Sequence, residues 1–278
     1  MDNIAQPAFI RGESGNLFTL YFPPNRSRNK RRGLLFFPPF AEELNKSRHM
    51  VTMQARRCAE VGYSVLLLDL FGTGDSEGDF GQATWSQWRQ DMFAGVHWLL
   101  NHGVHHVDYW GLRSGALLAL DVAREPDSIS CLDRVLLWAP VLRGSVFVTQ
   151  FLRLRMAADL ASDKGVKSVD TKQLKAALQR KEMIEVAGYD LSPELILPME
   201  SLELQGLQPS PGVRVDWFEL AAEGRPLSPA SLRLVEAWRA ANIQVSIQQV
   251  VGEAFWSTPE ITRVPDLLDA TMQVLGHE

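Results

Sequence analysis

Short, almost wholly apolar runs alternate with segments of helical pattern along most of this chain. The run YSVLLLDL (63–70) is followed by HVDYWGL (106–112) and DRVLLWAPV (133–141). Continuous apolar sequence of this kind is typical of a parallel strand covered on both faces. Because neighbouring parallel strands need helical crossovers, the alternation predicts an α/β fold with a doubly wound, mostly parallel sheet.

Elements before and after this central part extend the same pattern. We expect strands over 17–22 and 33–40, a helix opened by Ser47 and running to about Val61, a helix capped by Thr84, strands over 213–220 and 244–252, and a final helix from about Pro259. From Leu142 to about Pro211 the alternation stops. We therefore predict one domain over residues 1–278, with residues 142–211 inserted as a helical cap over a site at the carboxyl ends of the strands.

Composition excludes some classes of protein. The chain has 278 residues, 46% of them hydrophobic, which is enough for one large core, and a net charge of −5 argues against a nucleic-acid partner. No window has the length of apolar sequence that a transmembrane helix needs. The two cysteines, Cys58 and Cys131, have no metal-ligand spacing, and a reducing cytoplasm fits them best. We expect no metal and no cofactor.

The segment Gly111-Leu112-Arg113-Ser114-Gly115 joins a predicted strand to a predicted helix. This is the context of a nucleophile elbow, in which small flanking residues allow a strained turn to lift the central side chain above the sheet. Arginine stays protonated and has no lone pair to offer, so Arg113 is neither nucleophile nor general base. Ser114 is a weak substitute, because a shift of one residue turns its hydroxyl towards the first helical turn.

The positions of the histidines give an independent test of catalysis. In folds with this elbow the catalytic base lies in the loop after the last strand, which here reads VGEAFWSTPE and has no histidine. Of the six histidines only His277 follows the elbow, next to the end of the chain. Glu223 stands where the acid of a triad is expected, but without a histidine to orient it we interpret it as a loop carboxylate. The sequence thus lacks a Ser-His-acid triad.

Six segments together resemble one bacterial family, the exosortase A system-associated hydrolase 2 proteins. They are PPFAEELNKSR (38–48), DLFGTGDSEGDF (69–80), WGLRSGALLA (110–119), LWAPVLRGSVFVTQFLRLRMA (137–157), EVAGYDLSP (185–193) and GEAFWSTPE (252–260). The resemblance implies an α/β-hydrolase fold, a place in exopolysaccharide export or PEP-CTERM protein sorting, and arginine in the elbow as a family trait. Fold resemblance does not establish a reaction.

Loops after the strands are expected to converge above the sheet and form a polar pocket. Its candidate residues are Phe40, Glu42, Glu43, Arg48, Asp75, Arg113, Ser114, Phe255 and Trp256. Arg113 and Arg48 suggest a carboxylate, phosphate or pyrophosphate as ligand. The alternative is structural: Arg113 pairs with Glu42 or Glu43 and holds the pocket shut. Asp75, between glycine and serine, either orients a ligand or forms a turn.

Three functions remain open on this sequence. The first is a pseudoenzyme, an accessory protein that binds an anionic small molecule, a lipid-linked sugar or a protein of an export system. The second is an active hydrolase or acyltransferase with a non-standard set, in which Asp75 or Glu43 activates water and Arg113 stabilises an oxyanion. The third is an interaction subunit whose segment QFLRLRMAADL (150–160) docks on another protein or on the membrane face.

Overall fold

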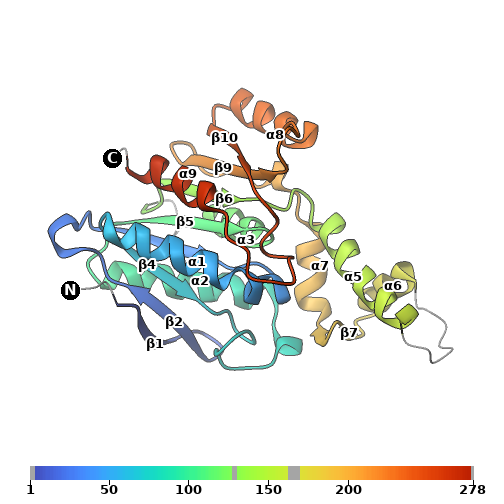
Figure 1. Ribbon diagram of the computed structural model, residues 1–278. Coiled ribbons are helices and arrows are strands. Elements are labelled where there is room, and N and C mark those ends of the chain that lie inside the picture. The colour runs from blue at the N-terminus through green and yellow to red at the C-terminus, as the bar shows by residue number, and fades with distance from the viewer. Residues whose placement is uncertain (1–3, 127–129, 162–169, 277–278) are drawn as a thin grey trace.

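The computed structural model describes residues 4–126, 130–161 and 170–276. Eight strands in these ranges form one sheet, in the order β1-β2-β4-β3-β5-β6-β9-β10 (Figure 1). β1 and β2 are antiparallel to each other, β2 is antiparallel to β4, and all pairs from β4 to β10 are parallel. The bounds are β1 Gln6–Arg11, β2 Asn16–Phe22, β3 Arg32–Phe37, β4 Tyr63–Leu68, β5 His106–Leu112, β6 Arg134–Trp138, β9 Arg214–Ala221 and β10 Gln244–Val251.

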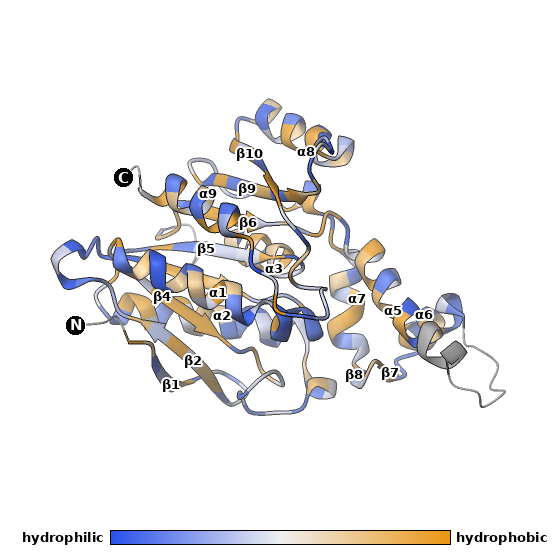
Figure 2. Ribbon diagram, in the orientation of Figure 1, coloured by the Kyte–Doolittle hydropathy of each residue, from blue (hydrophilic) through white to orange (hydrophobic). Residues whose placement is uncertain are grey.

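Helices cover both faces of the sheet, so the predicted doubly wound α/β architecture is confirmed. On one face lie α1 (Glu42–Glu60) and α9 (Pro265–Gly276), which share an apolar layer with the strands. On the other lie α2 (Trp85–Asn101), α3 (Gly115–Ala123) and α8 (Pro229–Ala240). In Figure 2 α3 is hydrophobic along most of its length, as expected of a helix packed on several sides. No helix in the described ranges combines the length and apolar character needed to cross a bilayer.

The elements between β6 and β9 stay outside the sheet. They are α5 (Gly144–Ala161), α6 (Thr171–Gln179), the hairpin of β7 (Ile184–Val186) and β8 (Tyr189–Leu191), α7 (Pro193–Ser201) and the 3₁₀ turn Leu204–Gly206. Figure 1 shows them beyond the right-hand end of the sheet. The ring of Phe40, in the loop after β3, lies 5.0 Å from Phe151 and 6.0 Å from Phe147, both on α5. Aromatic packing thus joins the inserted helices to the sheet's carboxyl edge.

Some sequence expectations were wrong in detail. The first helix begins at Glu42 rather than at Ser47, which is buried in mid-helix and donates from Oγ to Leu44 O at 3.0 Å. The last helix begins at Pro265 rather than near Pro259. Strand β1 and the β7–β8 hairpin were not predicted, since these segments lack a clear apolar period. The cap at Thr84 is confirmed, because its side chain accepts from Gln87 N at 3.1 Å.

A buried carboxylate fixes the loop that follows β4. Asp91 of α2 is 1% exposed, and its Oδ2 accepts a hydrogen bond from Phe71 N at 2.8 Å. Burial raises the pKa of Asp91 from its ordinary value of 3.8 to about 6, although the Phe71 bond acts in the opposite direction. The folded protein therefore holds this proton over a pH range in which the unfolded chain has released it.

Asp91 should make folding pH-dependent in a direction opposite to that of most carboxylates. Between pH 3.8 and about 6 the folded state binds more protons at this group, so its contribution to stability falls as pH rises. From pH 4 to 7, Asp91→Asn should gain about 2 kcal/mol in free energy of unfolding relative to wild type. Urea titrations across this range measure the difference. Asp75→Asn, at an exposed position, controls for loss of one charge, and a pH-independent Asp91→Asn difference would contradict the assignment.

Candidate functional site

Arg113 is the central residue of a strained turn between β5 and α3. Its φ is +55°, a left-handed conformation that non-glycine residues rarely adopt. Three backbone bonds hold it there: Arg113 N donates to Trp138 O at 3.0 Å, and Arg113 O accepts from Val141 N at 3.2 Å and from Ala116 N at 3.1 Å. This geometry is that of a nucleophile elbow, with a guanidinium at the position of the nucleophile.

The two glycines of the elbow are required by close backbone packing. A Cβ atom on Gly115 would lie 2.1 Å from Phe37 O and 2.6 Å from Pro38 O, at the end of β3. One on Gly111 would lie 2.6 Å from Ala116 Cα. Helix α3 therefore starts in direct backbone contact with β3, and the elbow has no room to shift.

The guanidinium of Arg113 contacts three groups: one in the first turn of α1, one directly after β6 and one in the loop after β10. Its Nε donates to Glu43 Oε1 at 3.4 Å, and its Nη1 donates to Ala139 O at 3.2 Å. Its Cζ lies 4.9 Å from the ring centre of Trp256, a cation–π contact. Nη2 makes no hydrogen bond with the described residues, and the side chain is 20% exposed. The arginine is thus held but not fully satisfied.

Three of the seven described non-glycine residues with a positive φ lie at this edge of the sheet. Ala41, before α1, has a φ of +53°, and Ala139, directly after β6, has a φ of +43°. With Arg113 they are left-handed non-glycine residues following β3, β5 and β6, which are neighbours in the sheet. Strained backbone persists where surrounding structure overdetermines it, and it gathers at functional sites.

Glu43 is the carboxylate partner of Arg113. It lies in the first turn of α1, with a side chain 21% exposed. Its Oε2 is buried and has no hydrogen-bond partner among the described residues. Burial raises the pKa of Glu43, and the charge and hydrogen bond of Arg113 partly offset the rise. The pair is therefore incomplete, because one carboxylate oxygen is desolvated without compensation.

Ser114 ties the elbow to the loop after β3. Its side chain is buried, and Oγ accepts from Phe40 N at 2.9 Å instead of capping α3. In this fold a backbone N–H of that loop commonly completes the oxyanion hole. Here the N–H of Phe40 is engaged by Ser114, and the serine hydroxyl points away from the elbow tip into the protein.

The loop after β10 supplies aromatic rings at the place of the catalytic base. Phe255 is 1% exposed and packs on Trp138 at 6.2 Å and on Trp256 at 5.1 Å. Trp256 in turn covers Arg113. Glu223, at the acid position, is exposed, and His277 lies outside the described residues. No three His, Cys, Asp or Glu side chains of the described ranges are placed to hold a metal ion.

The structure divides the predicted pocket residues into separate groups. Arg113, Glu43 and Trp256 meet, with Ser114, Phe40 and Phe255 adjoining them. Arg48 instead donates from Nη2 to Asp69, at 3.0 Å to Oδ1 and 3.1 Å to Oδ2. Asp75 is exposed, and its backbone N binds Asp69 Oδ2 at 3.1 Å, as a turn residue does. Glu42 accepts from Tyr189 of β8 at 3.3 Å.

The helix start explains this division. With α1 beginning at Glu42, Glu43 and Arg48 are five residues apart on a helix and point roughly 140° away from each other. When residues 38–48 were expected to form a loop, Glu43 and Arg48 could both be placed near the elbow. Asp69 was missed, although an aspartate directly after a buried strand and before a glycine-rich loop is a recognisable signal. The carbonyl of Ala139 has no sequence signal.

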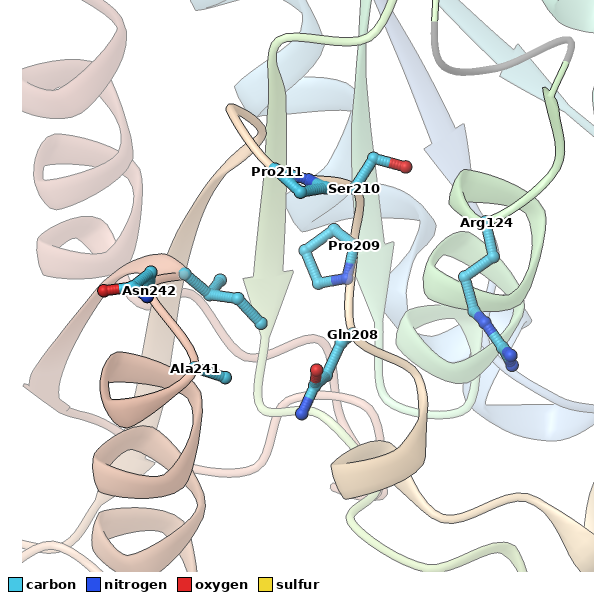
Figure 3. A pocket seen from close by; sticks show the side chains of 8 residues that line it. Arg124, Gln208, Pro209, Ser210, Pro211, Ala241 and Asn242 are labelled. Carbon is cyan, nitrogen blue, oxygen red and sulfur yellow. The ribbon is translucent and has the colours of Figure 1, made fainter.

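Two cavities lie away from Arg113. One of about 560 Å³ is at the opposite edge of the sheet, where β9 and β10 begin; Figure 3 shows Arg124, Gln208 and Asn242 among its lining residues. The other, of about 150 Å³, lies between α1 and the sheet beside Arg48. Neither is lined by Glu43, Arg113 or Trp256.

Comparison with known proteins agrees with this geometry. Residues 18–132 match the family model of the X-Pro dipeptidyl-peptidases (S15 family). No curated protein matches the sequence. Among solved structures, ferulic acid-bound Est1E from Butyrivibrio proteoclasticus superposes with a TM-score of 0.64 at 14% identity, covering 98% of this chain and 100% of that one.

Further solved structures share the same arrangement. XC6422 from Xanthomonas campestris, described as a serine hydrolase without lid, gives a TM-score of 0.59 at 14% identity, covering 100% of this chain and 96% of that one. Proline iminopeptidase from Mycobacterium smegmatis gives 0.61 at 13% identity, with 98% of both chains covered. At these identities the likeness concerns the fold, and it shows that this chain has the α/β-hydrolase fold.

The elbow packing predicts a steep cost for one added methyl group. Gly115→Ala should lower the free energy of unfolding by about 2 kcal/mol or more, because its Cβ would meet the backbone of β3. Gly206→Ala is the matched control, since nothing lies within 4 Å of a Cβ there. Thermal and urea unfolding of both variants measure the contrast. Equal stability of the two would show that α3 and β3 are not in the described contact.

Proposed function

We propose that this protein is a pseudoenzyme of the α/β-hydrolase fold that binds a small anionic ligand at Arg113. The observation that carries the proposal is the guanidinium at the elbow tip, stacked on Trp256 and only partly neutralised by Glu43. Arginine binds carboxylates and phosphates through a planar fork of donors. Nη2, which makes no hydrogen bond with the described residues, is available to a ligand.

The same groups argue against acyl-transfer chemistry. A guanidinium at the nucleophile position offers no lone pair. The loop that commonly bears the base presents Phe255 and Trp256, and the N–H of Phe40 is already bound to Ser114. The positions of the nucleophile, the base and one oxyanion donor are therefore each occupied by a group that does not perform that role.

A second function is favoured by the state of Glu43. Its pKa is raised and its Oε2 is unpaired, as suits a general base that activates water beside an arginine. In that case Arg113 stabilises an oxyanion, and the protein is a hydrolase or acyltransferase with a non-standard catalytic set. The purely structural alternative is that Arg113 and Glu43 only close the elbow.

The biological setting is proposed from sequence resemblance. Segments such as WGLRSGALLA (110–119) and GEAFWSTPE (252–260) support an association with the exosortase A and exopolysaccharide system. A lipid-linked sugar then supplies the anionic group, or an export-system protein is the partner. We also propose that residues 142–211 act as a cap, because the rings of Phe147 and Phe151 pack on Phe40 beside the site.

Assays for acyl transfer separate the two functions. The wild-type protein should neither turn over p-nitrophenyl acyl esters nor react with a fluorophosphonate probe. Ser114→Ala and Glu43→Gln should behave alike. Labelling that Ser114→Ala abolishes would overturn the pseudoenzyme proposal and make Ser114 the nucleophile, whereas ester turnover lost only in Glu43→Gln would establish the second function.

Anion binding tests Arg113 directly. Calorimetric titration with inorganic phosphate, pyrophosphate and acetate should show binding that Arg113→Ala weakens by about tenfold or more, a loss of at least 1.4 kcal/mol. Arg113→Lys should lose part of the affinity, since it keeps the charge without the fork. Arg225→Ala, at an exposed arginine of the β9–α8 loop, is the matched control. Equal affinity in Arg113→Ala and Arg225→Ala would leave only the structural role.

A further inference from the structure

A second cavity, of about 150 Å³, lies between α1 and the sheet and shares no residue with the contacts of Arg113. Its walls are mainly apolar. They are contributed by β2, β3, α1 and β4 through Phe18, Leu20, Phe36, Leu44, Val51, Leu67 and Leu68. Phe18, Leu20 and Leu67 are only half-buried, so the cavity is reachable from the surface. An apolar cavity of this size accepts a molecule the size of benzene.

A small residue at a core position borders this space. Ser47 is 0% exposed on the face of α1 that packs against the sheet, between Leu44 and Val51. Its Oγ turns back to Leu44 O at 3.0 Å, within its own helix. A larger apolar side chain would be the usual choice for such a position, because unfilled volume in a core costs packing energy.

Arg48 gives the cavity a polar rim. Only its Nη2 bonds Asp69, which is 5% exposed; its Nε and Nη1 make no hydrogen bond with the described residues. The side chain of Arg48 is 43% exposed, so these donors lie at the mouth. Apolar walls with a few fixed polar donors are the usual composition of a small-molecule site.

From these observations we infer that the cavity beside Arg48 binds a small, uncharged, mainly apolar molecule whose hydroxyl or carbonyl oxygen accepts from Arg48. The apolar body fills the space left by Ser47. A neutral acceptor is favoured over a carboxylate, because Asp69 already neutralises Arg48. The backbone N–H of Asp75 donates to the same Asp69 carboxylate, so Asp75 also lies on this side. A further negative charge would meet like charges on this side.

The test uses three probes of one size. Toluene lacks an acceptor, benzyl alcohol has a neutral one and benzoate has a charged one. Titration of the isotope-labelled protein should shift the amide signals of residues 44–52 and 67–69. Benzyl alcohol should bind about fivefold more tightly than toluene, the effect of one hydrogen bond, and benzoate should bind most weakly.

Variants assign the effect to the cavity. Ser47→Leu should abolish binding of every probe while circular dichroism shows a folded protein. Arg48→Gln keeps a donor for Asp69 but removes the other donors, so it should erase the preference for benzyl alcohol and leave toluene binding unchanged. Arg56→Gln, at an exposed arginine on the same helix, is the matched control and should change nothing.

The proposal would be overturned by any of three results. They are no shift at residues 44–52 with any probe, benzoate binding more tightly than benzyl alcohol, and an unchanged preference in Arg48→Gln. Benzoate carries a carboxylate that Arg113 is also proposed to bind, so the titrations are repeated in the Arg113→Ala protein. Their outcome is then independent of anion binding at the elbow, because Arg113 does not line this cavity.

Discussion

Backbone contact between the start of α3 and the end of β3 is the constraint on which the site depends. Gly115 brings the helix against the carbonyls of Phe37 and Pro38, and Gly111 permits the tight turn before it. The turn forces Arg113 into a left-handed conformation. Its side chain then has one direction to take, above the carboxyl edge of the sheet. The residue type at position 113 therefore decides the chemistry of the site, while the elbow geometry stays the same.

The positive charge of Arg113 is only partly neutralised by its neighbours. A buried arginine needs partners, and here a carboxylate, a carbonyl and an indole ring share that role. None of them is bidentate, and the carboxylate leaves one oxygen unpaired. Such partial neutralisation lowers the cost of burying the charge without satisfying every donor of the guanidinium. A fully paired arginine would have only a structural role.

The sequence predicted the sheet and the elbow because both have local signals. Apolar runs such as YSVLLLDL identify strands directly, and glycines around Arg113 mark the turn. The start of α1 was misplaced, because serine is a common helix cap and nothing in residue type reveals the left-handed Ala41. This misplaced helix start led to the wrong prediction that Arg48 and Arg113 share one pocket. The stacking of Trp256 on Arg113 depends on how distant loops converge, which no local pattern records.

Phe40 contacts two parts of the molecule. Its backbone N–H is held by Ser114 in the elbow, while its ring lies among Phe80, Trp88, Phe147 and Phe151. One residue therefore contacts both α5 and the elbow. A displacement of α5 changes the packing of that ring and, through the same backbone, the hydrogen bond that keeps an amide away from the elbow tip. The packing of α5 and the hydrogen bond at the elbow therefore meet at the same residue, Phe40.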